Sequence, residues 1–164
     1  MWWLVVAIPA VAFTVLGVLL WLGARERRRT NAELAAITSL PVAVAQERAL
    51  ALLERPDIFQ TTRASTPFTR SDLPSHVVAL FVLFDHVGCG EFWLGREALS
   101  QSARLPGFIK IGEDCEFTEI LVRPGDPLIY VSYGDGPQTE RTLETVPSVW
   151  HELLIAPGVP AESA

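Results

Sequence analysis

The sequence predicts a small α+β domain, an antiparallel sheet flanked by helices, that follows a single N-terminal transmembrane helix. Three observations lead to this prediction. The first 23 residues include no charged side chain. Three short apolar runs lie between residues 108 and 132 and are separated by turn residues. Helical segments precede and follow these runs, and because the runs are joined so closely, we expect an antiparallel meander.

Residues 1–23 are predicted to form the transmembrane helix. At 1.5 Å per residue they extend roughly 33 Å, enough for the hydrocarbon core of a bilayer. Indole rings favour the headgroup layer, and tryptophans stand at both ends: Trp2, Trp3 and Trp21. A cleaved signal peptide is the alternative, but its basic leader is missing and the nearest candidate cut, after Ala24, has Leu22 where a small residue is needed.

Four arginines follow the apolar segment directly: Arg25, Arg27, Arg28 and Arg29. Basic residues next to a span are retained in the cytoplasm. We therefore expect a protein of a bacterial inner membrane with its N-terminus outside and its C-terminal domain cytoplasmic. The same arginines are expected to lie at the membrane interface and to attract anionic lipid.

The charge of the chain is divided unevenly. Four arginines and one glutamate give the first 29 residues a charge of +3, so the total of −6 leaves −9 for the remainder. Phosphate repels such a domain, which argues against nucleic acid and favours a basic or mixed-charge protein partner; net charge also serves solubility. The sequence has no phosphate-binding glycine loop and no dinucleotide fingerprint, so no cofactor is predicted.

Residues 24–70 are predicted to form a basic juxtamembrane segment, a helix and a connector. The helical composition of residues 30–55 is interrupted at Ser39-Leu40-Pro41. There Ser39 is expected to cap a second helix, with Pro41 in its first turn. Residues 57–70 are expected to form a connector or a short edge element.

One domain is predicted for residues 71–156, followed by a flexible tail at residues 157–164. Ser71-Asp72-Leu73-Pro74 is typical of a capped helix start, and the apolar run through Asp85 is assigned to that helix. The remaining elements are assigned from their residue types and from the turn residues between them: a break at 87–90, a strand at 91–94, a helical turn at 96–102, strands at 108–112, 118–122 and 128–132, and a closing helix at 146–154 that Ser148 helps to start.

Candidate contact residues gather around the turn after the first of these three strands. Four of them are acidic: Glu113, Asp114, Glu116 and Glu119. Such a cluster is a solvated turn, a site for acid–base chemistry or a hard cation, or an edge that attracts a basic protein. Trp93 joins the candidate partner-binding residues because aromatic side chains often contribute most to binding at interfaces.

The two cysteines, Cys89 and Cys115, form no CxxC pair, and buried reduced thiols are expected in the cytoplasm. A zinc site that also includes His86 and His151 would lack the paired spacing of structural zinc sites, so no metal is predicted. The alternative function is a small membrane-tethered hydrolase that uses the acidic cluster, or Cys89 with His76, His86 or His151 as base.

The order of several short motifs between about residues 71 and 155 resembles the SUKH superfamily, which includes the yeast cell-wall assembly regulator and many bacterial toxin-immunity proteins. The motifs that carry the resemblance are Leu73-Pro74 before an apolar helix, Glu91-Phe92-Trp93-Leu94 after a glycine break, Ile111-Gly112-Glu113-Asp114 at a sheet entry, Ile129-Tyr130-Val131, and the closing segment from Pro147 to Leu154. The resemblance implies an α+β domain that binds a protein and performs no known chemistry. The expected partner is a toxin domain, or a cell-envelope or signalling protein.

Overall fold

The computed structural model describes residues 30–114, 118–133 and 142–158. The predicted transmembrane helix lies outside these residues, together with all the predicted membrane-interface residues, Cys115, Glu116 and residues 159–164 of the tail. The chain divides into two units, residues 1–36 and 37–164. Of the first unit only residues 30–36 are described, and they are helical.

Within the described ranges, no single helix has both the length and the apolar composition needed to cross a bilayer; Thr30–Thr38 and Val42–Leu53 meet these requirements only as a bent pair.

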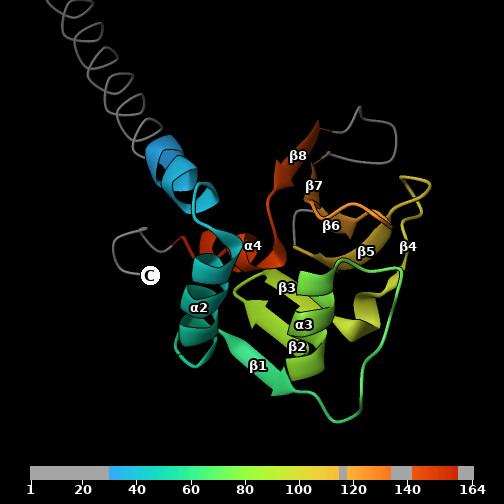
Figure 1. Ribbon diagram of the computed structural model, residues 1–164, viewed down its shortest axis with the longest axis horizontal. Helices are drawn as coiled ribbons and strands as arrows, with labels where there is room; N and C mark the ends of the chain where they lie inside the picture. The colour runs from blue at the N-terminus through green and yellow to red at the C-terminus, as the bar shows by residue number, and fades with distance from the viewer. Residues whose placement is uncertain (1–29, 115–117, 134–141, 159–164) are drawn as a thin grey trace, which may run out of the picture. The chain divides into compact units, whose positions relative to one another are not determined.

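The second unit has the predicted α+β fold, with an eight-stranded antiparallel sheet among its described residues (Figure 1). Its helices are α2 (Val42–Leu53), α3 (Ser75–Leu83) and α4 (Val149–Ile155). Its strands are β1 (Gln60–Arg63), β2 (Phe84–Cys89), β3 (Phe92–Gly95), β4 (Ser100–Gln101), β5 (Ile109–Glu113), β6 (Glu119–Val122), β7 (Ile129–Tyr133) and β8 (Thr142–Val146).

The strands follow one another across the sheet in the order β1-β2-β3-β5-β6-β7-β8, and β4 pairs with β5 beyond the end of β3. A 3₁₀ turn, Arg96–Ala98, connects β3 to β4. The predicted meander is therefore confirmed in β5, β6 and β7. The predicted connector at residues 57–70 contains β1, which is an edge strand.

Two predicted helix starts are wrong in the same way. Pro41 and Pro74 were expected in the first turn, but each is the N-cap residue, with ψ near 140°. The proline carbonyl oxygens accept the first helical hydrogen bonds, so Ser39 does not cap α2. A residue before proline is kept out of the helical region, which is why neither helix begins earlier.

Further segments differ from prediction, including residues 100–101 of the expected helical turn, which form β4. The apolar run leaves the helix at Leu83, and Phe84 begins β2 with extended backbone angles. Of the break expected at residues 87–90, the first three residues belong to that strand, and only Gly90 lies in the turn to β3. Strand β8 was not predicted, because all of its residues except Val146 are exposed and it lacks an apolar alternation.

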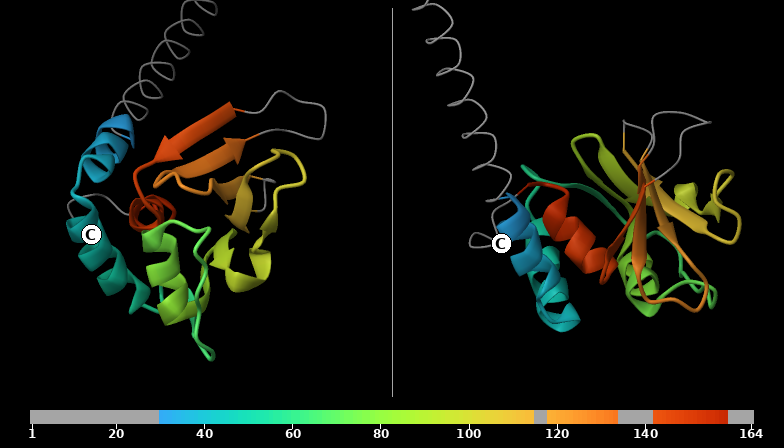
Figure 2. Two further views of the ribbon diagram at one scale, coloured as in Figure 1. Left: turned by 45° about the vertical axis from the view of Figure 1, so that its right-hand side comes forward. Right: turned by 90° about the horizontal axis from the view of Figure 1, so that it is seen from above.

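Helices and sheet enclose one core. Helix α4 packs against α2, α3 and β8 (Figure 2), and its Trp150, Leu153 and Leu154 are fully buried. From the sheet, Val87 and Leu94 point into the same core. His151 is also buried, and its ring nitrogens contact the Ser148 hydroxyl at 2.7 Å and the Leu40 carbonyl oxygen at 2.9 Å. This histidine ties α4 to the segment that precedes α2.

The backbones of β3 and β5 approach closely at Gly112. Leu94 pairs with Gly112, and the register of β5 against β6 shifts at Ile111. A Cβ on Gly112 would lie 2.2 Å from the Trp93 carbonyl oxygen and 2.7 Å from Leu94 Cδ2. Only glycine therefore fits here, and it sets the position of Trp93 relative to β5.

Candidate partner-binding site

A hollow of about 300 Å³ lies over strands β1 to β3. Its lining residues come from these strands, from the turn between β2 and β3, and from the 3₁₀ turn: Gln60, His86, Gly88, Gly90, Phe92, Trp93 and Glu97. Side chains alternate along a strand, and Val87 and Leu94 point into the core. His86 and Trp93 therefore lie on the opposite face of the sheet from the helices.

The two rings of the hollow support each other. Gly88 is the cross-strand partner of Trp93, and His86 is the partner of Gly95. The His86 and Trp93 rings stack with centroids 5.8 Å apart and an interplanar angle of 16°. A Cβ on Gly88 would lie 3.1 Å from His86 Nε2. The missing side chain at Gly88 thus leaves room for the imidazole beside the indole.

A carboxylate borders this ring pair. Glu97 Oε1 lies 2.7 Å from His86 Nδ1, so Nδ1–H donates a hydrogen bond to the carboxylate. Both side chains remain accessible, with 36% of His86 and 55% of Glu97 exposed. The bond orients the imidazole, and it leaves Nε2 as an acceptor whenever the ring is neutral.

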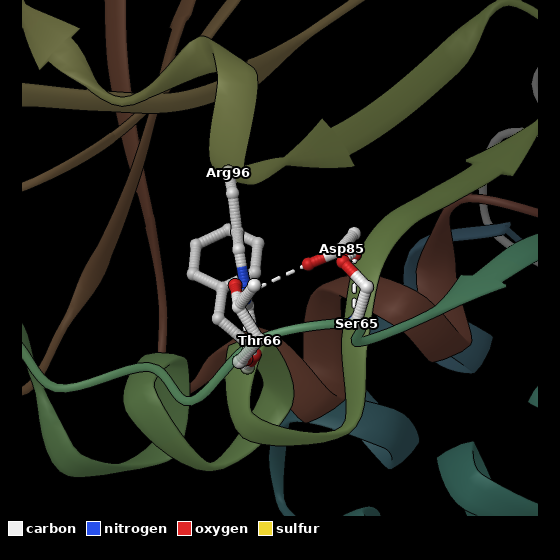
Figure 3. Close-up of polar contacts among 5 residues, drawn as sticks. Ser65, Thr66, Asp85 and Arg96 are labelled. Carbon is white, nitrogen blue, oxygen red and sulfur yellow. Dashed lines mark hydrogen bonds and ion pairs between the residues drawn. The ribbon is translucent and has the colours of Figure 1, made fainter.

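The turn that carries Glu97 is held by its neighbour Arg96. The Arg96 guanidinium donates to the carbonyl oxygens of Phe81 and Thr66, and it pairs with Asp85 Oδ1 at 2.8 Å (Figure 3). The same group stacks over the Phe68 ring at 4.8 Å. Arg96 therefore fixes the turn to α3, to β2 and to the loop before α3, while Glu97 faces the hollow.

Asp85 completes this network from the start of β2. Its Oδ2 accepts hydrogen bonds from the backbone N–H and the hydroxyl of Ser65, each at 3.0 Å (Figure 3). The Ser65 N–H, followed by the Ser65 hydroxyl and the positive charge of Arg96, holds the pKa of Asp85 below its ordinary value, against the opposing effect of burial. Asp85 is thus charged at neutral pH and supports Arg96.

The structure brings three of the five predicted partner-binding residues into one row. Trp93 pairs with Glu113 across β3 and β5, and Glu113 pairs with Glu119 across β5 and β6. Glu113 forms an ion pair with Lys110. Glu119 is buried, and its Oε2 accepts a hydrogen bond from the Ser102 hydroxyl at 3.3 Å. We call Glu113 and Glu119 the acidic row. The charge of Glu113 is partly neutralised by Lys110, and Glu119 is covered.

Of the other two predicted acidic residues only Asp114 is described, and it has a structural role. Asp114 closes the β5–β6 turn: its backbone N–H donates to the Thr118 carbonyl oxygen, and its carboxylate accepts from the Thr118 N–H, both at 3.1 Å. Glu116 lies outside the described residues. The predicted cluster thus includes a turn-forming residue as well as surface charge.

Sequence reasoning did not connect His86 and Glu97 with Trp93. The segment around Gly88 was interpreted as a break, although His86, Gly88 and Trp93 share one face once β2 and β3 are paired. The alternation of buried Val87 with smaller or polar neighbours is the signal that could have indicated a strand here.

None of the three histidines is hydrogen-bonded to Cys89. All three histidines lie in the described part of the chain, and the hydrogen bonds of their rings go to other residues: His76 bonds Pro127 and Val149, His86 bonds Glu97, and His151 bonds Ser148 and Leu40. Burial raises the pKa of the Cys89 thiol, which disfavours the thiolate. Across residues 30–114, 118–133 and 142–158, no three His, Cys, Asp or Glu side chains are placed to hold a metal ion.

A buried carboxyl lies on the other side of the sheet from the hollow. Glu152 of α4 is 8% exposed. Burial, followed by the negative charges of Glu144 and Asp114, raises its pKa to about 7. Burial and the same two carboxylates, with Glu152, raise the pKa of Tyr133 to about 12. Folding therefore favours the protonated form of Glu152.

Replacing Glu152 with glutamine is expected to change how stability depends on pH. Because the carboxyl titrates near 4.5 when exposed and near 7 when folded, its contribution is fully present below pH 4.5 and is lost as the pH rises through 7. At pH 8 we expect Glu152→Gln to raise the free energy of unfolding by roughly 2 kcal/mol, and at pH 4 to change it little. Urea unfolding at both pH values measures the difference. An equal effect at the two values would contradict the assigned pKa.

Comparison of the chain with protein-family models, curated proteins and solved structures found no match.

Proposed function

We propose that this chain is a membrane-anchored protein-binding domain, without catalytic activity, that uses the hollow and the adjoining acidic row to bind a basic protein segment. The observation that carries the proposal is the stacked pair of His86 and Trp93, partly exposed on the face of the sheet away from the helices and bordered by Glu97 and Glu113. The resemblance to the SUKH superfamily supports a binding role, either toxin immunity or recruitment of a cell-envelope or signalling protein.

An aromatic side chain in this setting is well suited to contribute binding energy. The indole of Trp93 is held by the His86 stack and by β3, so little conformational entropy is lost when a partner covers it. Tryptophan is among the residues that contribute most to interface energies, particularly in pockets from which water is displaced. The polar groups around Trp93 would form the rim of such an interface.

Charge would guide the encounter. The net charge of the residues after position 29 is −9. A basic partner would be attracted over a distance of about 8 Å at physiological ionic strength. Its association rate should therefore fall as salt is added, because screening acts on the approach of the two proteins.

The proposed anchor is the uncharged segment 1–23, with Arg25, Arg27, Arg28 and Arg29 on the cytoplasmic side. It would place the binding domain at the inner surface of a bacterial plasma membrane. A reporter that is active only in the cytoplasm should then be active when fused to the C-terminus. Activity of an export-dependent reporter at that position would contradict this topology.

Loss of Trp93 is expected to weaken partner binding strongly. With the full-length chain in detergent-solubilised membranes of its host, Trp93→Ala should reduce affinity for the captured partner about 30-fold, the effect of losing a central interface residue. Tyr133→Ala is the matched control, since Tyr133 is an exposed aromatic residue on β7, away from the hollow. Circular dichroism on both variants separates binding from folding.

A charge variant tests the same face without removing an aromatic ring. Glu113→Lys removes one partly exposed ion pair, so it should leave thermal stability almost unchanged. Capture of a basic partner should nevertheless weaken. If both Trp93→Ala and Glu113→Lys bind the partner as the wild type does, the assigned face is wrong.

A further inference from the structure

The described side chains of the hollow offer hydrogen-bond acceptors and aromatic rings but no positively charged group of lysine or arginine. Among the described residues that line it, only Glu97 carries a carboxylate. Glu97 Oε1 is engaged by His86 Nδ1, whereas no described residue donates a hydrogen bond to Oε2. With neutral His86, Nε2 is a second acceptor, and Trp93 supplies an aromatic surface. The hollow therefore presents acceptors and π electrons to whatever enters it.

From this complementarity we infer that the hollow receives the guanidinium group of an arginine side chain on the protein partner. The inference rests on the proposed function and specifies the chemistry of its ligand. One edge of the guanidinium would donate to Glu97 Oε2, and its plane would contact the ring pair of His86 and Trp93. When the partner covers Glu97, the guanidinium would supply the positive charge that pairs with its carboxylate.

Arginine fits these features better than lysine does. The guanidinium is planar, carries five N–H donors and stacks on aromatic rings, whereas the lysine ammonium is a compact and strongly hydrated charge. A cation over the face of tryptophan is attracted by the ring quadrupole. The volume of about 300 Å³ is at the lower limit for ligand sites, so it admits one long side chain rather than a secondary-structure element.

Other side chains meet an unfavourable environment. A carboxylate would be repelled by Glu97. An aliphatic side chain would cover Glu97 Oε2 and His86 Nε2 without donating to either, and covering a polar atom that has no hydrogen-bond donor is costly. The residues after position 29 are acidic overall, and this charge also favours a positively charged ligand.

The experiment uses the full-length chain in detergent micelles, with tryptophan labelled with ¹⁵N at the indole nitrogen. N-acetyl-arginine amide is the probe, and the neutral isostere N-acetyl-citrulline amide is its control. The chain has five tryptophans, and the Trp93→Phe variant assigns the Trp93 signal. We expect the Trp93 signal to shift saturably with a dissociation constant on the order of 10 mM, while buried Trp150 does not respond.

Two comparisons decide the outcome. The citrulline probe should leave the Trp93 signal unmoved, and Glu97→Gln should weaken arginine binding at least about threefold. Glu97 is an exposed side chain, so Glu97→Gln is expected to fold, and the unchanged Trp150 signal verifies this. No shift at Trp93, or an equal shift with the citrulline probe, would overturn the inference.

Failure of this inference is distinct from failure of the proposed function. If the arginine probe does not bind but Trp93→Ala weakens partner capture as expected, the face binds a protein through other chemistry. If neither Trp93→Ala nor Glu113→Lys affects capture, the proposed function fails at this face even where the small probe binds.

Discussion

Gly112→Ala is expected to lower the free energy of unfolding by about 3 kcal/mol, a large part of the stability of a domain of this size. The added methyl would overlap the Trp93 carbonyl oxygen, and it would also lie within 3.1 Å of the Leu94 Cα. Both are backbone atoms of β3, so the clash cannot be relieved by rotating a side chain. The strands must separate, and hydrogen bonds between β3 and β5 are lost.

Urea unfolding of the full-length chain, followed by circular dichroism, measures this effect. Gly95→Ala is the matched control, because a Cβ there would also be crowded, at 2.5 Å, but the three nearest atoms all belong to the carboxyl group of Glu97. That flexible group can turn away, so we expect a change below about 1 kcal/mol. Equal stability of the two variants would show that β3 and β5 do not approach as described.

Arg96→Met is expected to cost about 3 kcal/mol. The variant keeps a side chain of similar length but loses every donor to Phe81, Thr66 and Asp85. The Arg96 side chain is only 14% exposed and that of Asp85 26%, so water cannot fully replace these contacts. The penalty comes mainly from Asp85 Oδ1 and the Phe81 carbonyl oxygen, which lose the donors of Arg96, while Asp85 Oδ2 keeps its bonds to Ser65.

Arg55→Met provides the control for removing an arginine. Its partner Asp57 lies two residues away, and more than half of each side chain is exposed. Exposed pairs of this kind contribute little, so Arg55→Met should leave the free energy of unfolding almost unchanged. The same denaturation measurement compares the two variants. A similar small effect for Arg96→Met would show that the network around Asp85 does not stabilise the fold.

The sequence predicted those parts of the fold that depend on local signals. The meander of β5, β6 and β7 was predicted because turn residues separate three apolar runs. The boundary between α3 and β2 was missed, since residues 76–85 are apolar almost throughout and show neither helical nor strand periodicity. Strand β8 was missed because tertiary pairing with β7, rather than an apolar pattern, makes it a strand.

The candidate site was predictable to a similar extent. Trp93 and Glu113 were selected for their residue types alone, and the register of β3 against β5 places them opposite each other. His86 and Glu97 could not be predicted as members of the site. Their contact depends on the pairing of the strands and on a turn that Arg96 holds by its bond to Phe81. The pairing register between strands that are distant in sequence cannot be predicted from the residue spacing of one sequence.

The 3₁₀ turn directs two adjacent residues, Arg96 and Glu97, to opposite sides. Arg96 faces inward and maintains the architecture, whereas Glu97 faces outward beside the ring pair. A substitution at position 97 should therefore change the chemistry of the hollow with little effect on folding, whereas a substitution at position 96 should destabilise the domain. If the hollow binds a partner as proposed, its preference could thus evolve through single replacements at position 97 while the scaffold is kept.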